Sequence, residues 1–102
     1  MNFPSLDKLI HEQSRLKILI YLSQKSPQKT TFSKMKKDLD MTSGNLSIQL
    51  KKLEQAEWIN QKKVIEKNKV KTYINITDNG IDALNQYLTD LESLLSNIKG
   101  DK

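Results

Sequence analysis

The stretch that decides the fold is Leu39-Asp40-Met41-Thr42-Ser43-Gly44-Asn45-Leu46-Ser47-Ile48-Gln49-Leu50-Lys51-Lys52-Leu53. Leu46, Leu50 and Leu53 recur at i, i+4 and i+7, which is the spacing of one buried stripe along a helix. Thr42 is a natural N-cap, because its hydroxyl can accept a hydrogen bond from a free amide in the first helical turn. The stretch therefore predicts a helix over Ser43 to Ala56 that begins directly after a tight turn.

The segments on either side of this helix predict a second helix and a hairpin. Phe32 to Leu39 places its apolar residues on one helical face, so a short helix should precede the turn. Two β-prone runs follow, Trp58 to Ile65 and Val70 to Ile76, and Lys67-Asn68 between them suits a hairpin tip. Helix, turn, helix and two-stranded ribbon is the order in which a protein can lay one helix in a DNA major groove and brace it on the flanking backbone.

The outward face of the predicted second helix is unusual for a surface helix. With the leucines inward, 100° per residue places these residues on or beside the opposite face: Gly44, Asn45, Ser47, Ile48, Lys51, Lys52 and Gln55. Small polar groups can approach base edges, an apolar side chain can touch a thymine methyl, and lysines can reach phosphates. Serine and asparagine could also merely cap the helix start. The preceding helix and the following hairpin favour the nucleic-acid interpretation over that one.

Positive charge is concentrated around the same motif. The chain has 17 basic and 12 acidic residues, a net charge of +5. Residues 24–76 hold twelve lysines and five acids, whereas residues 77–102 hold two lysines and five acids. The middle of the chain should thus attract a polyanion. Lysines also serve as a solvated surface, and on a hairpin they prevent edge-to-edge pairing, so charge alone does not separate these roles.

Several function classes are disfavoured by what the chain lacks. It has no cysteine and a single histidine, His11, which leaves no acid–base or nucleophile pair and no metal ligand set. We therefore expect no enzymatic activity, no catalytic residue, no metal and no cofactor. The longest apolar run, Ile18 to Leu22, is far shorter than the roughly 20 residues that cross a bilayer, and no signal pattern is visible. A soluble, cytoplasmic protein without a membrane partner is expected.

Both ends of the chain carry apolar helical patterns. Ser14 to Leu22 should form the central core helix, with Ser14 as N-cap, and an earlier apolar segment should pack beside it. After Thr77-Asp78 a long C-terminal helix is predicted, with leucines and isoleucines at alternating steps of three and four that form an apolar seam along it. The apolar surface of this seam is larger than a small core can cover. This helix could fold back on the N-terminal segment or meet a second copy, and we favour both in one homodimer. The residues expected there are Leu6, Leu9, Ile81, Leu84, Leu88, Leu91, Leu95 and Ile98.

With these motifs in place, the chain resembles a winged helix-turn-helix transcriptional regulator of the MarR-like and ArsR-like kind, more narrowly the compact winged helix DNA-binding domain regulators. The likeness rests on Arg15 to Leu19, Leu39 to Ser47, Leu50 to Ile59 and Lys71 to Gly80, the last ending in a Thr-x-x-Gly helix start. One departure is Glu57, where such regulators commonly have glycine before the aromatic residue that opens the wing. It affects the expected local turn and not the fold.

The resemblance implies a homodimeric repressor or activator whose second motif helix reads the major groove. On that basis the residues facing base edges would be Ser43, Gly44, Asn45, Ser47, Ile48 and Gln49. Lys51 and Lys52 would hold phosphates, and the wing lysines, including Lys67, Lys69 and Lys71, would contact the backbone or the minor groove. A metal-sensing activity is not carried over, because clustered cysteine or histidine ligands are absent.

Together these patterns predict a mainly α protein with a small β-hairpin (α+β), a winged helix-turn-helix with an extended C-terminal dimerisation helix. Residues 1–78 would form the DNA-binding domain, and residues 79–102 would dimerise together with the N-terminal helix. The expected partners are double-stranded DNA and a second copy of the chain. Whether a small-molecule effector exists stays open. The alternative is a winged-helix protein–protein interaction module without specific DNA binding.

Overall fold

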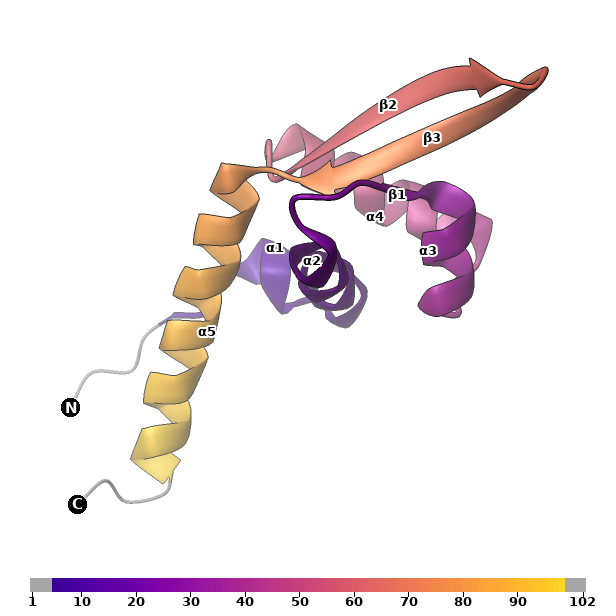
Figure 1. Ribbon diagram of the computed structural model, residues 1–102. Helices are drawn as coiled ribbons and strands as arrows, with labels where there is room; N and C mark the ends of the chain where they lie inside the picture. The colour runs from indigo at the N-terminus through magenta and orange to yellow at the C-terminus, as the bar shows by residue number, and fades with distance from the viewer. Residues whose placement is uncertain (1–4, 99–102) are drawn as a thin grey trace.

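The computed structural model describes residues 5–98 and confirms a winged helix-turn-helix fold (Figure 1). The elements in chain order are α1 (Lys8–His11), α2 (Gln13–Lys25), β1 (Thr30–Thr31), α3 (Phe32–Asp38), α4 (Ser43–Gln55), β2 (Ile59–Glu66), β3 (Lys69–Ile76) and α5 (Asp78–Ile98). The helices α2, α3 and α4 lie on one side of a long β2–β3 hairpin, and α5 runs away from its base (Figure 1).

The predicted helix boundaries are confirmed to within a residue for the two motif helices, and their ends follow from local hydrogen bonding. The Thr42 Oγ1 accepts from the Asn45 amide at 3.1 Å and starts α4 as predicted. The central helix differs: α2 begins at Gln13, one residue before Ser14, because Glu12 Oε1 accepts from the Arg15 amide at 3.0 Å. Of the predicted N-terminal apolar segment, Phe3 lies outside the described residues.

Both motif helices end in the same backbone motif, which sets the turn between them and the entry to the hairpin. After α3 the Met41 amide donates to the Lys36 carbonyl at 3.1 Å, and Asp40 has φ 52°. After α4 the Trp58 amide donates to the Leu53 carbonyl at 3.1 Å, and Glu57 has φ 64°. This is the Schellman arrangement, whose left-handed residue is usually glycine. The position at which the resemblance leads one to expect glycine is thus left-handed here, and Glu57 fills it.

The sheet is antiparallel with strand order β1-β3-β2, and its alternation divides the hairpin into two faces. Ile59 pairs with Ile76, and the register continues to Glu66 opposite Lys69. Lys67 and Asn68 have φ 50° and 65°, which confirms the predicted tip. Because Ile59, Ile74 and Ile76 are buried against the helices, residues in phase with them face the helical side.

One hydrophobic core joins α2, α4, the sheet base and the first half of α5. Its members are Ile10, Ile18, Leu19, Leu22, Met35, Leu46, Leu50, Leu53, Ile59, Ile74, Ile76, Leu84 and Tyr87. Leu46, Leu50 and Leu53 are 0% exposed, which confirms the predicted inward stripe of α4. Each such leucine contributes about 1.5–3 kcal/mol to the free energy of folding, so the stripe holds α4 in one rotation about its axis.

Candidate nucleic-acid interface

The face of α4 opposite the leucine stripe is open to solvent. Its exposed residues, on or beside the position opposite the leucines, are Gly44, Asn45, Ser47, Ile48, Lys51, Lys52 and Gln55, and exposed Ser43 precedes them at the helix start. Ile48 is 56% exposed, an unusual position for an isoleucine in the middle of a helix. These positions agree with the expected outward face, because the burial of the leucines sets the rotation of the helix. Small polar groups therefore precede an exposed apolar side chain, and the lysines come after it.

Gln49 is the exception, and its predicted position on the base-facing side is wrong. Its side chain is only 9% exposed. The Gln49 Oε1 accepts from Arg15 Nη1 of α2 at 2.7 Å, and its Nε2 donates to Asn45 Oδ1 at 3.0 Å. Gln49 comes three residues after Leu46, next to the buried stripe, and so lies at its edge. A resemblance that marked the whole segment as base-facing could not separate this residue from its neighbours.

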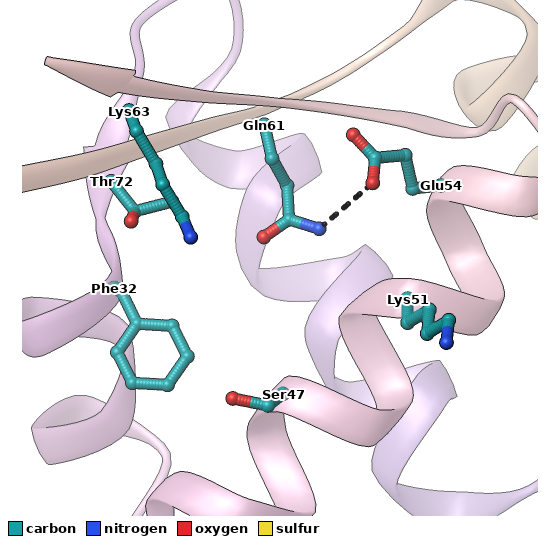
Figure 2. A pocket seen from close by; sticks show the side chains of 7 residues that line it. All are labelled: Phe32, Ser47, Lys51, Glu54, Gln61, Lys63 and Thr72. Carbon is teal, nitrogen blue, oxygen red and sulfur yellow. Dashed lines mark hydrogen bonds between the residues drawn. The ribbon is translucent and has the colours of Figure 1, made fainter.

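A groove of about 630 Å³ separates α4 from the wing, the name used here for the β2–β3 hairpin. Its lining residues are Phe32, Ser47, Lys51, Glu54, Gln61, Lys63 and Thr72. Figure 2 shows Lys63 projecting from the wing towards the helices, while Ser47 points into the groove from α4. Gln61 Nε2 donates to Glu54 Oε1 at 3.3 Å and ties the wing to the last turns of α4 (Figure 2).

The wing lysines divide between its two faces. Lys63 is in phase with buried Ile59 and lies on the helical side, whereas Lys69 and Lys71 alternate to the other face. Lys71 Nζ lies 3.4 Å from Glu66 Oε1. Lys67 occupies the tip. The site set predicted from the sequence left out Lys63, although the alternation that starts at Ile59 would have placed it beside α4.

The predicted dimerisation residues, on α5 and near the N-terminus, separate into buried, half-buried and exposed groups. Leu84 is 4% exposed and belongs to the subunit core, so the expectation that it meets a second chain is wrong. Leu6, Leu9, Ile81, Leu88 and Leu91 are half-buried within the subunit. Leu95 and Ile98 are 43% and 80% exposed. Within the subunit, His11 Nδ1 and the Tyr87 hydroxyl lie 2.8 Å apart, which joins α1 to α5.

A hydrogen-bonded cluster fixes α3 against α2. The Tyr21 hydroxyl donates to Asp38 Oδ2 at 2.6 Å, and Lys34 Nζ lies 3.4 Å from the same oxygen. The hydrogen bond from Tyr21, together with Lys34, lowers the pKa of Asp38. Burial, followed by the bond to Asp38, raises the pKa of Tyr21. The cluster therefore holds the helix that precedes the turn into α4.

Comparison with known proteins decides the family. Residues 14–95 match the model of the winged helix DNA-binding domain. An uncharacterised protein of Methanocaldococcus jannaschii is 36% identical over 92 residues, which cover 90% of this chain and 98% of the relative. The chain belongs to the winged helix DNA-binding domain family.

Solved structures of this winged-helix protein's relatives agree with its fold. A transcriptional regulator homologue from Pyrococcus horikoshii OT3 is similar with TM-score 0.80 and 30% identity, covering 88% of this chain and 87% of that one. Lactococcus lactis ZitR, described as a zinc-responsive MarR family member, matches with TM-score 0.61 and 21% identity over 98% of this chain and 65% of its own. A ZitR mutant has also been solved in complex with DNA. At that identity the likeness to ZitR shows the fold alone.

Two further features of the winged-helix protein bear on its chemistry. Within residues 5–98, no three His, Cys, Asp or Glu side chains are grouped so that they could hold a metal ion. Over the same residues, no helix has the length and apolar character needed to cross a membrane. The matched family and the Pyrococcus relative are DNA-binding domains and transcriptional regulators, not enzymes.

Proposed function

We propose that this protein is a sequence-specific, double-stranded DNA-binding transcriptional regulator, repressor-like, that acts as a cytoplasmic homodimer. The observation that carries the proposal is the solvent-open face of α4, with exposed Ile48 opposite three fully buried leucines and exposed Asn45 and Ser47 on either side of it. An α-helix with such a face fits the width of the major groove, where base edges differ from one base pair to the next.

The base-reading residues in this proposal lie in the first two turns of α4. Ser43, Asn45 and Ser47 can exchange hydrogen bonds with base edges. Gly44 has no side chain, and nothing lies within 4 Å of the position that a Cβ would take, so the helix backbone can come close to the DNA there. Ile48 supplies an apolar contact of the kind that a thymine methyl offers. Gln49 is excluded from this set because its side chain is buried.

The phosphate-binding residues lie on both sides of the groove between α4 and the wing. Lys51 lines it from α4 and Lys63 from the wing, so a sugar–phosphate strand lying across the groove would meet an ammonium group from each. Lys52 extends the positive face of α4, and Lys67, Lys69 and Lys71 surround the wing tip. Such contacts give affinity and register but no direct sequence information.

A homodimer is proposed from the apolar residues that α5 leaves outside the core. Leu95 and Ile98 continue the seam of Leu88 and Leu91 beyond the point where α2 covers it. A second copy presents the same stripe and would cover both, as in the isologous interface of a two-fold dimer. Two α4 helices related in this way would enter major grooves about 34 Å apart, or at a multiple of that distance. No effector is assigned.

Binding to a random duplex at several salt concentrations tests the proposal. We expect binding at low salt that weakens steeply as salt rises, because each phosphate contact releases counterions. Lys51→Ala should reduce the slope of log affinity against log salt by about one. Lys17→Ala on α2, an exposed lysine outside the groove, is the matched control and should leave the slope unchanged. Absence of binding even at low salt would favour the protein–protein interaction module instead.

A further inference from the structure

A chain of three side chains connects the interior of the protein to the open face of α4. Arg15 of α2 and Gln49 of α4 are each 9% exposed, and Asn45, one turn before Gln49, is exposed. The Arg15 Nε donates to the Leu9 carbonyl, and its Nη1 donates to Gln49 Oε1 at 2.7 Å. Gln49 Nε2 then donates to Asn45 Oδ1 at 3.0 Å.

The chemistry of the guanidinium group sets the direction of both hydrogen bonds in the series Arg15, Gln49 and Asn45. Arginine has only donors, so Gln49 must present its oxygen to Arg15. The Gln49 amino group is then directed at Asn45, which must accept the hydrogen bond with its side-chain oxygen. Reversing Gln49 would place two donors against each other in a buried site, at a cost of about 1–3 kcal/mol. Asn45 is thus held with its oxygen inward and its Nδ2 amino group free to face outward.

We infer that Arg15 and Gln49 are positioning residues that make Asn45 a hydrogen-bond donor in DNA recognition. The inference rests on the DNA-binding function proposed above. Asparagine usually reads adenine with both its oxygen and its amino group, and here the oxygen is turned inward to Gln49. Asn45 should therefore select a base that offers an acceptor in the major groove, such as guanine O6 and N7 or thymine O4. It should disfavour the N4 amino group of cytosine at that point of contact.

Gln49→Glu reverses the hydrogen bond between residue 49 and Asn45 and still provides an acceptor for the buried Arg15. A carboxylate accepts from Arg15 as the glutamine oxygen does, and it pairs the guanidinium charge. It cannot donate to Asn45, so Asn45 should turn, donate its amino group inward and present its oxygen to the DNA. Gln13→Glu makes the same chemical change at an exposed position of α2, away from the open face of α4, and it serves as the matched control.

The experiment is selection from a random pool of duplexes, carried out in parallel with the native protein, Gln49→Glu and Gln13→Glu. With Gln49→Glu we expect one position in each half-site to change from an acceptor base to a donor base, cytosine or adenine. The change in relative affinity there should be roughly tenfold, and the other positions should keep their preference. Gln13→Glu should select the native sequence.

An unchanged base preference with folded Gln49→Glu protein, checked by its thermal unfolding, would overturn the inference and leave the proposed function intact. If Gln49→Glu does not fold, Asn45→Asp tests the same orientation at an exposed position, because its carboxylate still accepts from Gln49 and presents an oxygen outward in place of the amino group. The preference at that one position should then change from an acceptor base to a donor base. A preference that stays with acceptor bases would overturn the inference. Failure of the native protein to enrich any sequence would instead overturn the proposed function, and the inference with it.

Discussion

Gly80 shows how a single missing side chain fixes the join between the wing and α5. A Cβ built there would lie 2.2 Å from the Trp58 carbonyl oxygen and 2.7 Å from Ile76 Cγ1. That carbonyl already accepts from the Thr77 amide at 2.9 Å, and Thr77 Oγ1 accepts from the Gly80 amide at 3.0 Å. The Thr-x-x-Gly pattern of the sequence therefore has a packing reason, since the backbone of Trp58, directly before β2, touches the first turn of α5.

Gly80→Ala should lower the free energy of unfolding by about 2–3 kcal/mol, because the methyl group must displace backbone atoms. Gly44→Ala is the control, since nothing lies within 4 Å of its Cβ position. It should be neutral or stabilise by up to about 1 kcal/mol through helix propensity. Urea unfolding of both variants measures the two values. Equal effects would show that the contact with Trp58 imposes no strain.

Glu57 occupies a left-handed backbone position with φ 64°. Glu57→Gly should stabilise the protein by roughly 0.5–1 kcal/mol, since the relief of the Cβ clash exceeds the added entropy of the unfolded chain. Glu57→Ala keeps the Cβ and removes the charge, so it separates the two causes. Thermal unfolding is the measurement, and an equal gain from alanine would attribute the effect to the carboxylate.

The pair formed by Tyr21 and Asp38 predicts a pH-dependent stability. The Asp38 pKa is lowered in the folded protein by the Tyr21 hydroxyl and by Lys34, so the paired carboxylate stabilises the fold above its unfolded pKa. That contribution is lost as pH falls through the folded pKa. Tyr21→Phe should therefore destabilise at neutral pH, and the difference from the native protein should shrink as pH falls below the ordinary aspartate pKa of about 3.9 and through the lowered pKa of the folded protein. A difference that stays constant in urea unfolding across this range would contradict the assignment.

At the scale of elements, the helices and the hairpin were predictable, whereas which side chain faces which partner was only partly so. Periodicity placed Leu46, Leu50 and Leu53 inside and α4 between the correct residues, because the stripe is regular and long. Gln49 was misplaced because the resemblance marked the whole segment as base-facing, although its i+3 spacing from Leu46 places it beside the buried stripe. Its hydrogen-bond partner Arg15, 34 residues away, lies outside any local pattern. Leu84 was misplaced because a seam alone does not tell which of its turns the subunit's own core covers.

The two faces of the wing give a prediction at this scale. Lys63→Ala should weaken DNA binding more than Lys71→Ala, because Lys63 lies beside α4 whereas Lys71 lies on the far face and is paired with Glu66. The expected loss for Lys63→Ala is a reduction of the salt slope by about one, with a smaller change for Lys71→Ala. Titrations of one duplex at several salt concentrations check this. A larger effect at Lys71 would place the DNA on the outer face of the wing.

For the whole molecule, the exposed end of α5 predicts self-association. Leu95→Glu combined with Ile98→Glu places two charges in the stripe that a second copy would cover, so the protein should sediment as a monomer. Ser93→Glu adds charge to the same helix at an exposed position nearly opposite Leu95 and should leave the dimer intact. Sedimentation equilibrium distinguishes the outcomes. Native protein that sediments as a monomer would refute the proposed dimer, as would variants that all remain dimeric.

The central claim is that the open face of α4 lies in the major groove, and intermolecular nuclear Overhauser effects in a complex with a selected duplex test it most directly. We predict contacts from Asn45, Ser47 and Ile48 side-chain protons to major-groove base protons, with Ile48 methyls near a thymine methyl. Contacts that come only from α5 or from the outer face of the wing, with none from α4, would contradict it.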